Sequence, residues 1–396
     1  MFAPYADILR TPGARAFVLA GFVGRLPMAM IGLGTVLLVR AATGSYGVAG
    51  GVSATIAIAN AIGAPQIGRL VDRFGQRRVL LPAMAIHVAG VAGLLLAATL
   101  DAPTVAFFLA AFVAGGAFPS FGSLVRARWT NLLGGTERLQ TAYALESVLD
   151  ELVFTLGPVL VTLLATSIAP EVGLATGLGF LLLGGLSFAS LRATEPPVVR
   201  DRGRGGSAIR TPGLVVLALV LVGLGGVFGT IEVSMVAFAD EHGRPALSGP
   251  LLALHAISSG LAGIAYGARA WKLPLHRRLQ VALALLFVGT IPLALADTIP
   301  LMVGAIVVSG LTISPTLITS FALVEALVPR TALTEGFAWL STSLGAGVAI
   351  GLAVAGHVVD ATSGHRAFTV AIASSLLGAL AVFAGRRWLA AGAAAR

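Results

Sequence analysis

The chain has 396 residues, of which 57% are hydrophobic and 11% charged, and its mean hydropathy is +0.94. A soluble domain carries about 25% charged residues, so the composition excludes a soluble enzyme and indicates an integral membrane protein. The formal net charge is +9 and Cys is absent, which excludes disulfides and Cys-ligated metals. The single lysine, Lys272, precedes Leu273, so the chain has no Gly-Lys-Ser/Thr phosphate-binding loop.

Twelve apolar runs are long enough to cross a bilayer, which takes about 20 residues per helix. The runs lack the alternating period of a transmembrane β-barrel, so the predicted fold class is an all-α integral membrane protein with 12 transmembrane helices. The first run is too long for a cleavable signal peptide. The runs cover residues 14–39, 46–69, 79–99, 103–125, 139–166, 171–191, 213–239, 247–268, 279–296, 299–325, 335–358 and 366–385.

The positions of the basic residues predict the orientation in the membrane. With the N-terminus in the cytoplasm, 22 of the 26 basic residues fall in inner segments, Arg126 and Arg128 among them. Arg25 is then the one basic residue inside a span. Because cytoplasmic loops carry the excess of Lys and Arg, we expect a multi-pass protein of the cytoplasmic (inner) membrane with both termini in the cytoplasm.

The sequence repeats itself at an offset of about 200 residues. Residues 10–13, Arg-Thr-Pro-Gly, recur at 210–213, and the Arg-Arg pair at 77–78 recurs at 277–278. Parallel repeats related by an axis along the membrane normal are typical of secondary transporters. The expected organisation is an N-terminal six-helix bundle over 1–192, a cytoplasmic linker over 193–211 and a C-terminal six-helix bundle over 212–396.

The loop after the second run carries a recognisable motif. It reads Gly68-Arg69-Leu70-Val71-Asp72-Arg73-Phe74-Gly75-Gln76-Arg77-Arg78. This resembles the signature loop of the major facilitator superfamily (MFS), in which Gly, x, Leu, x, Asp, Arg, x and Gly precede basic residues. The resemblance implies the MFS fold, two pseudo-symmetric six-helix bundles, and transport by alternating access.

The resemblance also implies a gating role for the loop. In that family the loop Asp contacts the start of the eleventh span and nearby Arg residues, and so holds the cytoplasmic side shut. Here Asp72 would contact the segment around Thr334 and either Arg126 or Arg128. The alternative is that the loop arginines only set the topology. The candidate gating residues are Gly68, Asp72, Arg73, Gly75, Arg77 and Arg78.

The residue types in this loop suit that role. Gly68 allows close helix contact, and Gly75 allows a tight turn with positive φ. The carboxylate of Asp72 can accept hydrogen bonds from the free N–H groups at a helix start. Glu335, in the first turn of the eleventh run, is expected to interact only with its own helix dipole.

Ionisable residues within spans cost about 2.5–3.5 kcal/mol each at mid-bilayer and usually have a function. Arg25 in the first run and Glu146, Asp150 and Glu151 in the fifth are such residues. A rise of about 1.5 Å per residue places Arg25 and Asp150 at similar depth, so we expect them to meet near the midplane. Three acids facing one Arg would leave a carboxylate to carry a proton or bind substrate, with Asp150 favoured and then Glu146. The alternative is a fixed ion-pair network that orients the two spans.

Weaker features point to the outer face and to export. Glu232 in the seventh run lies near the predicted outer face, where it would bind a cationic substrate group or an outer-gate partner, or else remain solvated at the interface. Gly157-Pro158 in the fifth run resembles the end of a longer glycine-rich pattern in drug/proton antiporters, and a helix kink is the simpler interpretation. Gly345, Gly347 and Gly351 in the eleventh run predict close helix packing and no dinucleotide site.

The sequence therefore predicts a secondary transporter that moves a small molecule, most simply by proton-coupled efflux. The alternatives are proton-coupled or facilitated uptake of a small metabolite and a ligand sensor that does not transport. We expect a monomer whose partners are a small-molecule substrate, protons and the lipid bilayer. We expect no nucleic acid, no metal, no cofactor and no enzymatic activity.

Overall fold

The computed structural model describes residues 3–198, 207–244 and 247–394, and these residues form helices and loops without strands. Within them, 12 helical segments are long and apolar enough to cross a membrane, which confirms the predicted number of spans and the all-α class. The first eight helices, called the N-terminal helix group, are α1 (Ala3–Leu9), α2 (Ala14–Thr43), α3 (Tyr46–Phe74), α4 (Gln76–Thr99), α5 (Thr104–Gly116), α6 (Phe121–Leu133), α7 (Arg138–Ser167) and α8 (Pro170–Ser190).

The remaining long helices are called the C-terminal helix group. They are α9 (Pro212–Glu241), α10 (Ser248–Gly267), α11 (Leu275–Leu295), α12 (Ile299–Leu327), α13 (Leu333–Ala361), α14 (Gly364–Ala384) and α15 (Arg386–Ala394). Short 3-10 helices cover Arg192–Thr194, Ala208–Arg210 and Arg330–Ala332. Residues 199–206, which hold Arg200, Arg202 and Arg204 of the predicted linker, lie outside the described residues.

The fourth span differs from its prediction. The apolar run ends near residue 125, but the candidate span continues to Leu133 and is broken between α5 and α6, around Pro119. Proline lacks the N–H that a helix interior needs, so α6 starts anew after it. Arg126 and Arg128 therefore lie inside this span and are 2% and 1% exposed. The prediction that Arg25 alone lies within a span is wrong.

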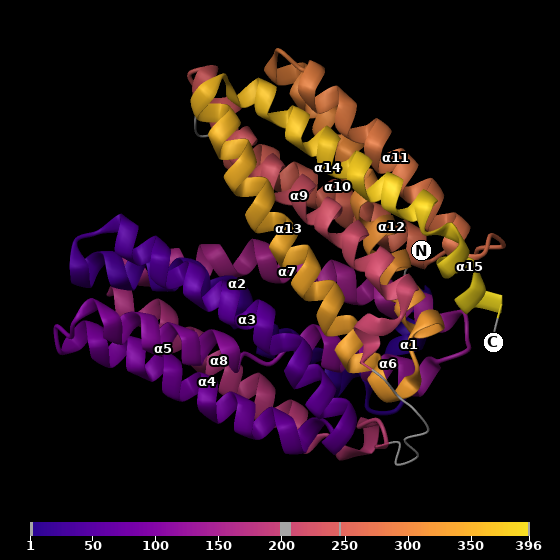
Figure 1. Cartoon of the computed structure of the whole chain (residues 1–396), viewed down its shortest axis with the longest axis horizontal. Helices are drawn as coiled ribbons and strands as arrows, with labels where there is room; N and C mark the ends of the chain where they lie inside the picture. The colour runs from indigo at the N-terminus through magenta and orange to yellow at the C-terminus, as the bar shows by residue number, and fades with distance from the viewer. Residues whose placement is uncertain (1–2, 199–206, 245–246, 395–396) are drawn as a thin grey trace.

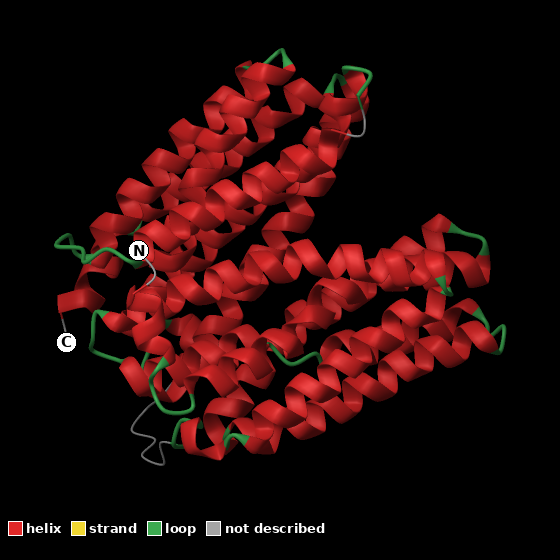
Figure 2. Cartoon of the chain, turned by 180° about the vertical axis from the view of Figure 1, so that it is seen from behind, coloured by secondary structure: helices red, strands yellow, loops and turns green. Residues whose placement is uncertain are grey.

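The two helix groups meet at one end of the molecule and diverge toward the other (Figure 1, Figure 2). Within the N-terminal group α2 packs on α7 and α8, and within the C-terminal group α9 packs on α13 and α14. Contacts between the groups join α13 to α3, and α7 to α10 and α12. We call the end where the groups meet, which carries α1 and α15, the junction end.

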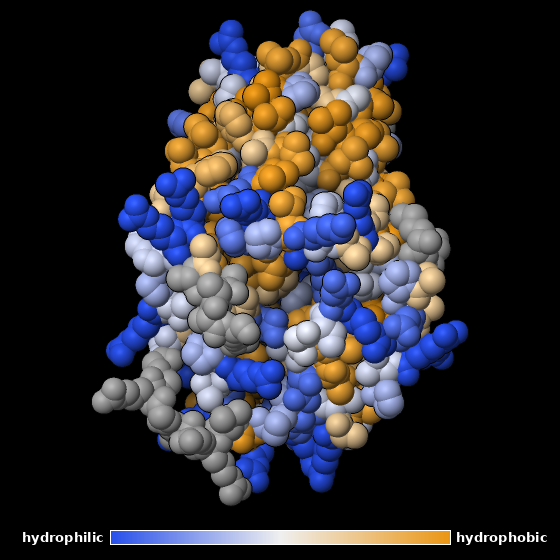
Figure 3. All heavy atoms as spheres, turned by 90° about the vertical axis from the view of Figure 1, so that its right-hand side faces the viewer, coloured by the Kyte–Doolittle hydropathy of each residue, from blue (hydrophilic) through white to orange (hydrophobic). Residues whose placement is uncertain are grey.

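Figure 3 views the molecule from the junction end, and hydrophilic side chains gather over the middle and lower parts of this face. The upper part of the same view is mostly hydrophobic. Elsewhere long apolar side chains are exposed on the outside of the helices, for example Leu19, Ile58 and Leu163 at 58–64%. Exposed apolar helix surfaces of this extent suit contact with lipid.

Candidate functional site

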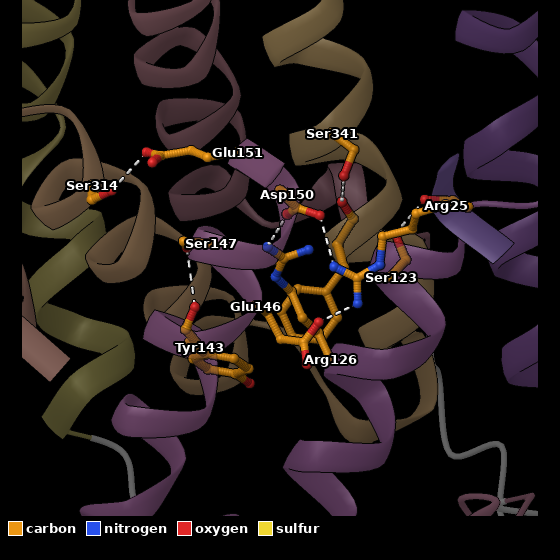
Figure 4. Close-up of polar contacts among 12 residues, drawn as sticks. Arg25, Ser123, Arg126, Tyr143, Glu146, Ser147, Asp150, Glu151, Ser314 and Ser341 are labelled. Carbon is orange, nitrogen blue, oxygen red and sulfur yellow. Dashed lines mark hydrogen bonds and ion pairs between the residues drawn. The ribbon is translucent and has the colours of Figure 1, made fainter. Parts of the chain in front are cut away.

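Two arginines and two acids form a buried charge network among α2, α6 and α7 (Figure 4). Arg25 donates to Glu146 through Nη2 and to Asp150 Oδ1 through Nη1, the latter at 2.7 Å. Arg126 Nη2 donates to Asp150 Oδ2, also at 2.7 Å. The side chains of Arg25, Arg126 and Glu146 are 0–2% exposed, whereas Asp150 keeps 28%. Asp150 is therefore the member of the network whose side chain is not fully enclosed by the protein.

The network confirms one expectation and corrects another. Arg25 meets Asp150, as their similar depths predict. The predicted surplus of acids facing a single Arg is wrong, because Arg126 joins the network and balances the second carboxylate. Trp129 Nε1 also donates to Glu146 at 2.8 Å. Buried ion pairs are tolerated when their remaining hydrogen-bonding capacity is satisfied, and this arrangement meets that condition for Glu146.

Glu151 stands apart from the network although it follows Asp150 in the chain. A one-residue step turns about 100° around a helix, and in Figure 4 the Glu151 side chain points away from Asp150 toward Ser314. Its Oε1 accepts hydrogen bonds from Ser259 on α10 and from Ser314 on α12, the second at 3.0 Å. None of the ion pairs formed by the described residues includes Glu151. This half-buried carboxylate therefore joins the two helix groups through hydroxyls.

Asp72 caps the first turn of α13 from the other helix group. Its Oδ1 and Oδ2 accept hydrogen bonds from the backbone N–H groups of Thr334 and Glu335, at 3.0 and 2.9 Å. A Cβ on Gly68 would lie 2.9 Å from Glu335 Cα, and Gly75 has a φ of +92°. The expected contact of Asp72 with the eleventh span, the close approach at Gly68 and the positive φ at Gly75 are all confirmed.

The arginine partners expected for Asp72 are wrong. Arg126 binds Asp150, and Arg128 binds Gln76, Thr194 and the carbonyls of Phe188 and Leu191. Neither side chain donates a hydrogen bond to Asp72 among the described residues. Arg69 is the arginine at this contact, and its Nη2 donates to Glu335 Oε1 at 3.0 Å.

Glu335 does more than complement a helix dipole. It accepts hydrogen bonds from Arg69 of the signature loop and from Ser207, just before the short helix Ala208–Arg210. Ser207 Oγ in turn accepts a bond from Arg69 Nη2 at 2.6 Å. The junction end thus ties the loop, the segment before α9 and the start of α13 into one cluster.

The other loop residues lie around this cluster. Arg73 and Arg78 are exposed, with the Arg73 guanidinium 4.9 Å from the centre of the Phe74 ring. The backbone N–H of Arg77 donates to Glu195 Oε1 at 3.0 Å, which caps the start of α4. Arg77 therefore contributes to this cap through its backbone. The gating role of the Arg77 and Arg78 side chains stays a prediction.

The remaining predicted residues are not brought into the charge network. Glu232 is exposed on α9, and no hydrogen bond or ion pair among the described residues joins it to Arg25, Glu146 or Asp150. Gly157 lies against α2, where an added Cβ would meet the Ala29 Cβ at 2.6 Å. Gly157 thus provides close packing of α2 on α7 beside Pro158, which remains inside the helix.

Comparison with known families now identifies the chain. The sequence model of the Major Facilitator Superfamily matches residues 17–299, which is more than half of the chain. The chain belongs to the Major Facilitator Superfamily. As an MFS protein of the 12-span type, it carries a fold that implies secondary transport across a membrane, and it is a transporter rather than an enzyme. A comparison with curated protein sequences gives no significant match.

Solved structures of MFS transporters share this fold. The human organic anion transporter MFSD10 superposes with a TM-score of 0.71 at 18% identity, over 94% of this chain and 100% of that one. A bacterial homologue of the iron transporter ferroportin in an outward-facing state gives 0.73 at 15%, over 94% and 99%. The E. coli fucose:proton symporter gives 0.70 at 13%, over 93% and 98%. The superpositions show that the fold is shared, and identities this low leave the substrate open.

Three residue types at the site escape prediction from sequence. Arg126 and Trp129 lie beyond the apolar run that marks the fourth span, so hydropathy assigns them to a loop. Ser259 and Ser314 are ordinary residues of apolar helices, and their link to Glu151 appears only once α7, α10 and α12 are placed together. Among the described residues no cluster of three His, Asp or Glu could hold a metal ion.

Proposed function

We propose that this MFS protein exports a small amphipathic molecule in exchange for protons. In this proposal the bundles over 1–192 and 212–396 rock about the charge network, and the junction end faces the cytoplasm. The excess of arginine around that end supports the orientation. The contacts of Asp72 with α13 hold that end shut, which corresponds to an outward-facing state like the one named for the bacterial ferroportin homologue.

The contact of Glu151 with Ser259 and Ser314 is the observation that carries proton coupling. A carboxylate that accepts hydrogen bonds from two hydroxyls is stabilised in its ionised form. Protonation of Glu151 removes acceptor capacity and weakens this link between the helix groups. Because binding and conformation are thermodynamically linked, a proton on Glu151 favours separation of the groups at the junction end.

Geometry favours Glu151 over Asp150 as the proton carrier. Asp150 accepts hydrogen bonds from two arginines, Arg25 and Arg126, and a proton there would leave two buried cations short of a partner. Breaking a buried ion pair costs about 3–5 kcal/mol. Glu151 faces hydroxyls on both α10 and α12, so it can accept a proton without uncovering a buried charge.

The export direction rests on the resemblance of Gly157-Pro158 to the drug/proton antiporters. The structure adds that Gly157 packs α7, the helix of Glu151, against α2, the helix of Arg25. Movement of α7 relative to α10 and α12 would therefore carry the charge network with it. This connection makes α7 the element that couples proton binding to the rocking of the bundles.

The first test is a ligand screen followed by flux measurements. Compounds that bind only the folded state raise its melting temperature, so a thermal-shift screen of the purified protein selects candidates. In proteoliposomes with the junction end outside, an acidic lumen should drive labelled candidates into the vesicles as protons leave. An alkaline lumen should not drive this uptake. Uptake driven in the same direction as proton flow would replace export by symport, and flux that ignores the gradient would remove proton coupling.

A further inference from the structure

A second contact between the helix groups lies beside the charge network. The guanidinium carbon of Arg126 on α6 sits 3.8 Å from the ring centre of Phe321 on α12. Asp150 binds the same guanidinium through the 2.7 Å hydrogen bond from Nη2. Arg126 and Phe321 are 2% and 4% exposed. The attraction of a cation to an aromatic face strengthens when both are removed from water.

One donor of the buried Arg126 side chain is left without a hydrogen bond among the residues that the structure describes. Its Nε is buried and makes no hydrogen bond to the described residues. A buried charged group with an unpaired donor is costly unless another favourable interaction meets it. The face of Phe321, on a helix of the opposite group, offsets part of the cost of burying this cation.

Aromatic rings extend this contact across the interface. Phe321 packs on Phe337 of α13 with ring centres 6.2 Å apart, and Phe337 packs on Tyr143 of α7 at 6.0 Å. The Tyr143 hydroxyl bonds to Thr130 Oγ1 of α6 at 2.6 Å. Tyr143 and Phe337 are buried. The cluster therefore links α6 and α7 of one group to α12 and α13 of the other.

We propose that Arg126 and Phe321 form the inner gate of the transporter and that Asp150 is the residue that positions Arg126 on the ring. Separation of the helix groups at the junction end takes the aromatic face away from a guanidinium that stays bound to Asp150. The stacked pair therefore stabilises the state in which this end is closed. The proposal rests on the alternating-access part of the proposed function and is independent of proton transfer by Glu151.

Graded fluorination of Phe321 tests the gate with almost no change of shape. Fluorine atoms withdraw electron density from the ring and weaken its attraction for a cation. Thr141→Cys provides the reporter in a chain without Cys, because Thr141 Oγ1 donates to the Gly267 carbonyl across the interface at 2.7 Å and the residue is 6% exposed. Labelling of this Cys by a maleimide reports opening of the junction end.

We expect the labelling rate to rise with each added fluorine, by about 2- to 10-fold over the series, as the size of cation–aromatic contacts indicates. The same series at Phe337 is the matched control, since its ring contacts Phe321 and Tyr143 and no guanidinium among the described residues lies over it. A rate independent of fluorination at Phe321, or an equal rise at Phe337, would overturn the gate.

Repeating the fluorination series in two variants, Glu151→Gln and Asp150→Asn, separates this proposal from proton coupling. Glu151→Gln should leave the fluorine dependence at Phe321 unchanged, because Glu151 does not touch the stacked pair. Asp150→Asn should flatten that dependence, since an amide holds the guanidinium less firmly. If the labelling rate in Asp150→Asn depended on fluorination as strongly as in the parent chain, Asp150 would not be the positioning residue. The fluorination series in the parent chain tests the gate itself, whether or not this variant folds.

Discussion

Both helix groups have helices in close contact at glycines, such as Gly63 against Gly116 and Gly347 against Val222, and they differ in the charge buried in their interiors. In the N-terminal group four charged side chains, Arg25, Arg126, Glu146 and Asp150, form a buried network around α7. In the C-terminal group α9 and α13 approach until their backbones touch, and an added Cβ on Gly347 would lie 2.2 Å from the Val222 carbonyl oxygen.

This difference assigns different work to the two groups. Charges concentrated in the N-terminal group can respond to protons and polar ligands, because their pairing changes with protonation. Glycine-mediated packing makes α9 and α13 a rigid unit, because close backbone contact leaves little room for rearrangement. The C-terminal group meets the charged side with hydroxyls and an aromatic face, supplied by Ser259, Ser314 and Phe321.

The largest effect is expected where the network is most deeply buried. Glu146 is 0% exposed and binds Arg25 and Trp129. Glu146→Ala leaves a buried guanidinium short of a partner, which costs about 3–5 kcal/mol in unfolding free energy. Glu137→Ala, an exposed acid just before α7, should change it by less than about 0.5 kcal/mol. Equal losses for the two variants, measured by denaturant titration in detergent, would contradict a buried network.

The glycine contact of the C-terminal group is tested by adding a methyl group instead of removing a side chain. Gly347→Ala places a methyl group 2.2 Å from the Val222 carbonyl oxygen and should cost about 1–3 kcal/mol through overpacking. Gly345→Ala, two residues earlier on α13, meets nothing within 4 Å and should be neutral or slightly stabilising. The order of the two melting temperatures checks this, and a stable Gly347→Ala would show that α9 and α13 can move apart.

The cap of α13 by Asp72 joins the two groups, so its loss should shift conformation more than stability. Asp72→Asn keeps the shape but loses the charge that strengthens both N–H bonds. Maleimide labelling of Thr141→Cys should become about 3- to 10-fold faster, which corresponds to about 0.7–1.4 kcal/mol, and transport should slow while membrane insertion is normal. Unchanged labelling together with unchanged transport would remove the gating role.

The smallest effect is expected at His242, on the end opposite the junction. Its Nδ1 and Nε2 lie 2.8 and 3.0 Å from the Phe238 and Asp297 carbonyl oxygens, and only the protonated ring donates to both. These hydrogen bonds, first that to Phe238, raise the pKa of His242. A raised pKa stabilises the fold below about pH 6.5, and the contribution is lost as pH rises through the folded value.

His242 is exposed, so water and salt screen its interactions. His242→Gln should therefore lower the melting temperature by less than about 2 °C at pH 5.5 and leave it unchanged at pH 8.5. If His242→Gln lowered the melting temperature more at pH 8.5 than at pH 5.5, the neutral ring rather than the protonated ring would be the stabilising form.

Hydropathy and one motif predict most of the fold. Twelve spans, the Asp72 contact with the start of α13 and the meeting of Arg25 with Asp150 follow from run length, a signature loop and helical rise. The packing of α13 follows in part, because Gly347 and Gly351 contact α9 whereas Gly345 meets open space.

The remainder depends on how helices are placed in space. Pro119 divides the fourth span, and the residues after 125 look like a loop by composition although Arg126 and Arg128 are buried in α6. The separation of Glu151 from Asp150 needs the rotation of α7, and its serine partners are 108 and 163 residues away in the chain. A single sequence holds no signal that pairs such distant, unremarkable residues.

Proton coupling through Glu151 is the central claim, and Glu151→Gln tests it most directly. Glutamine keeps the shape of the side chain and cannot release a proton in the working range. In proteoliposomes we predict that Glu151→Gln retains substrate exchange without a gradient and loses all accumulation driven by a pH gradient. Gradient-driven accumulation at the rate of the parent protein would contradict the account.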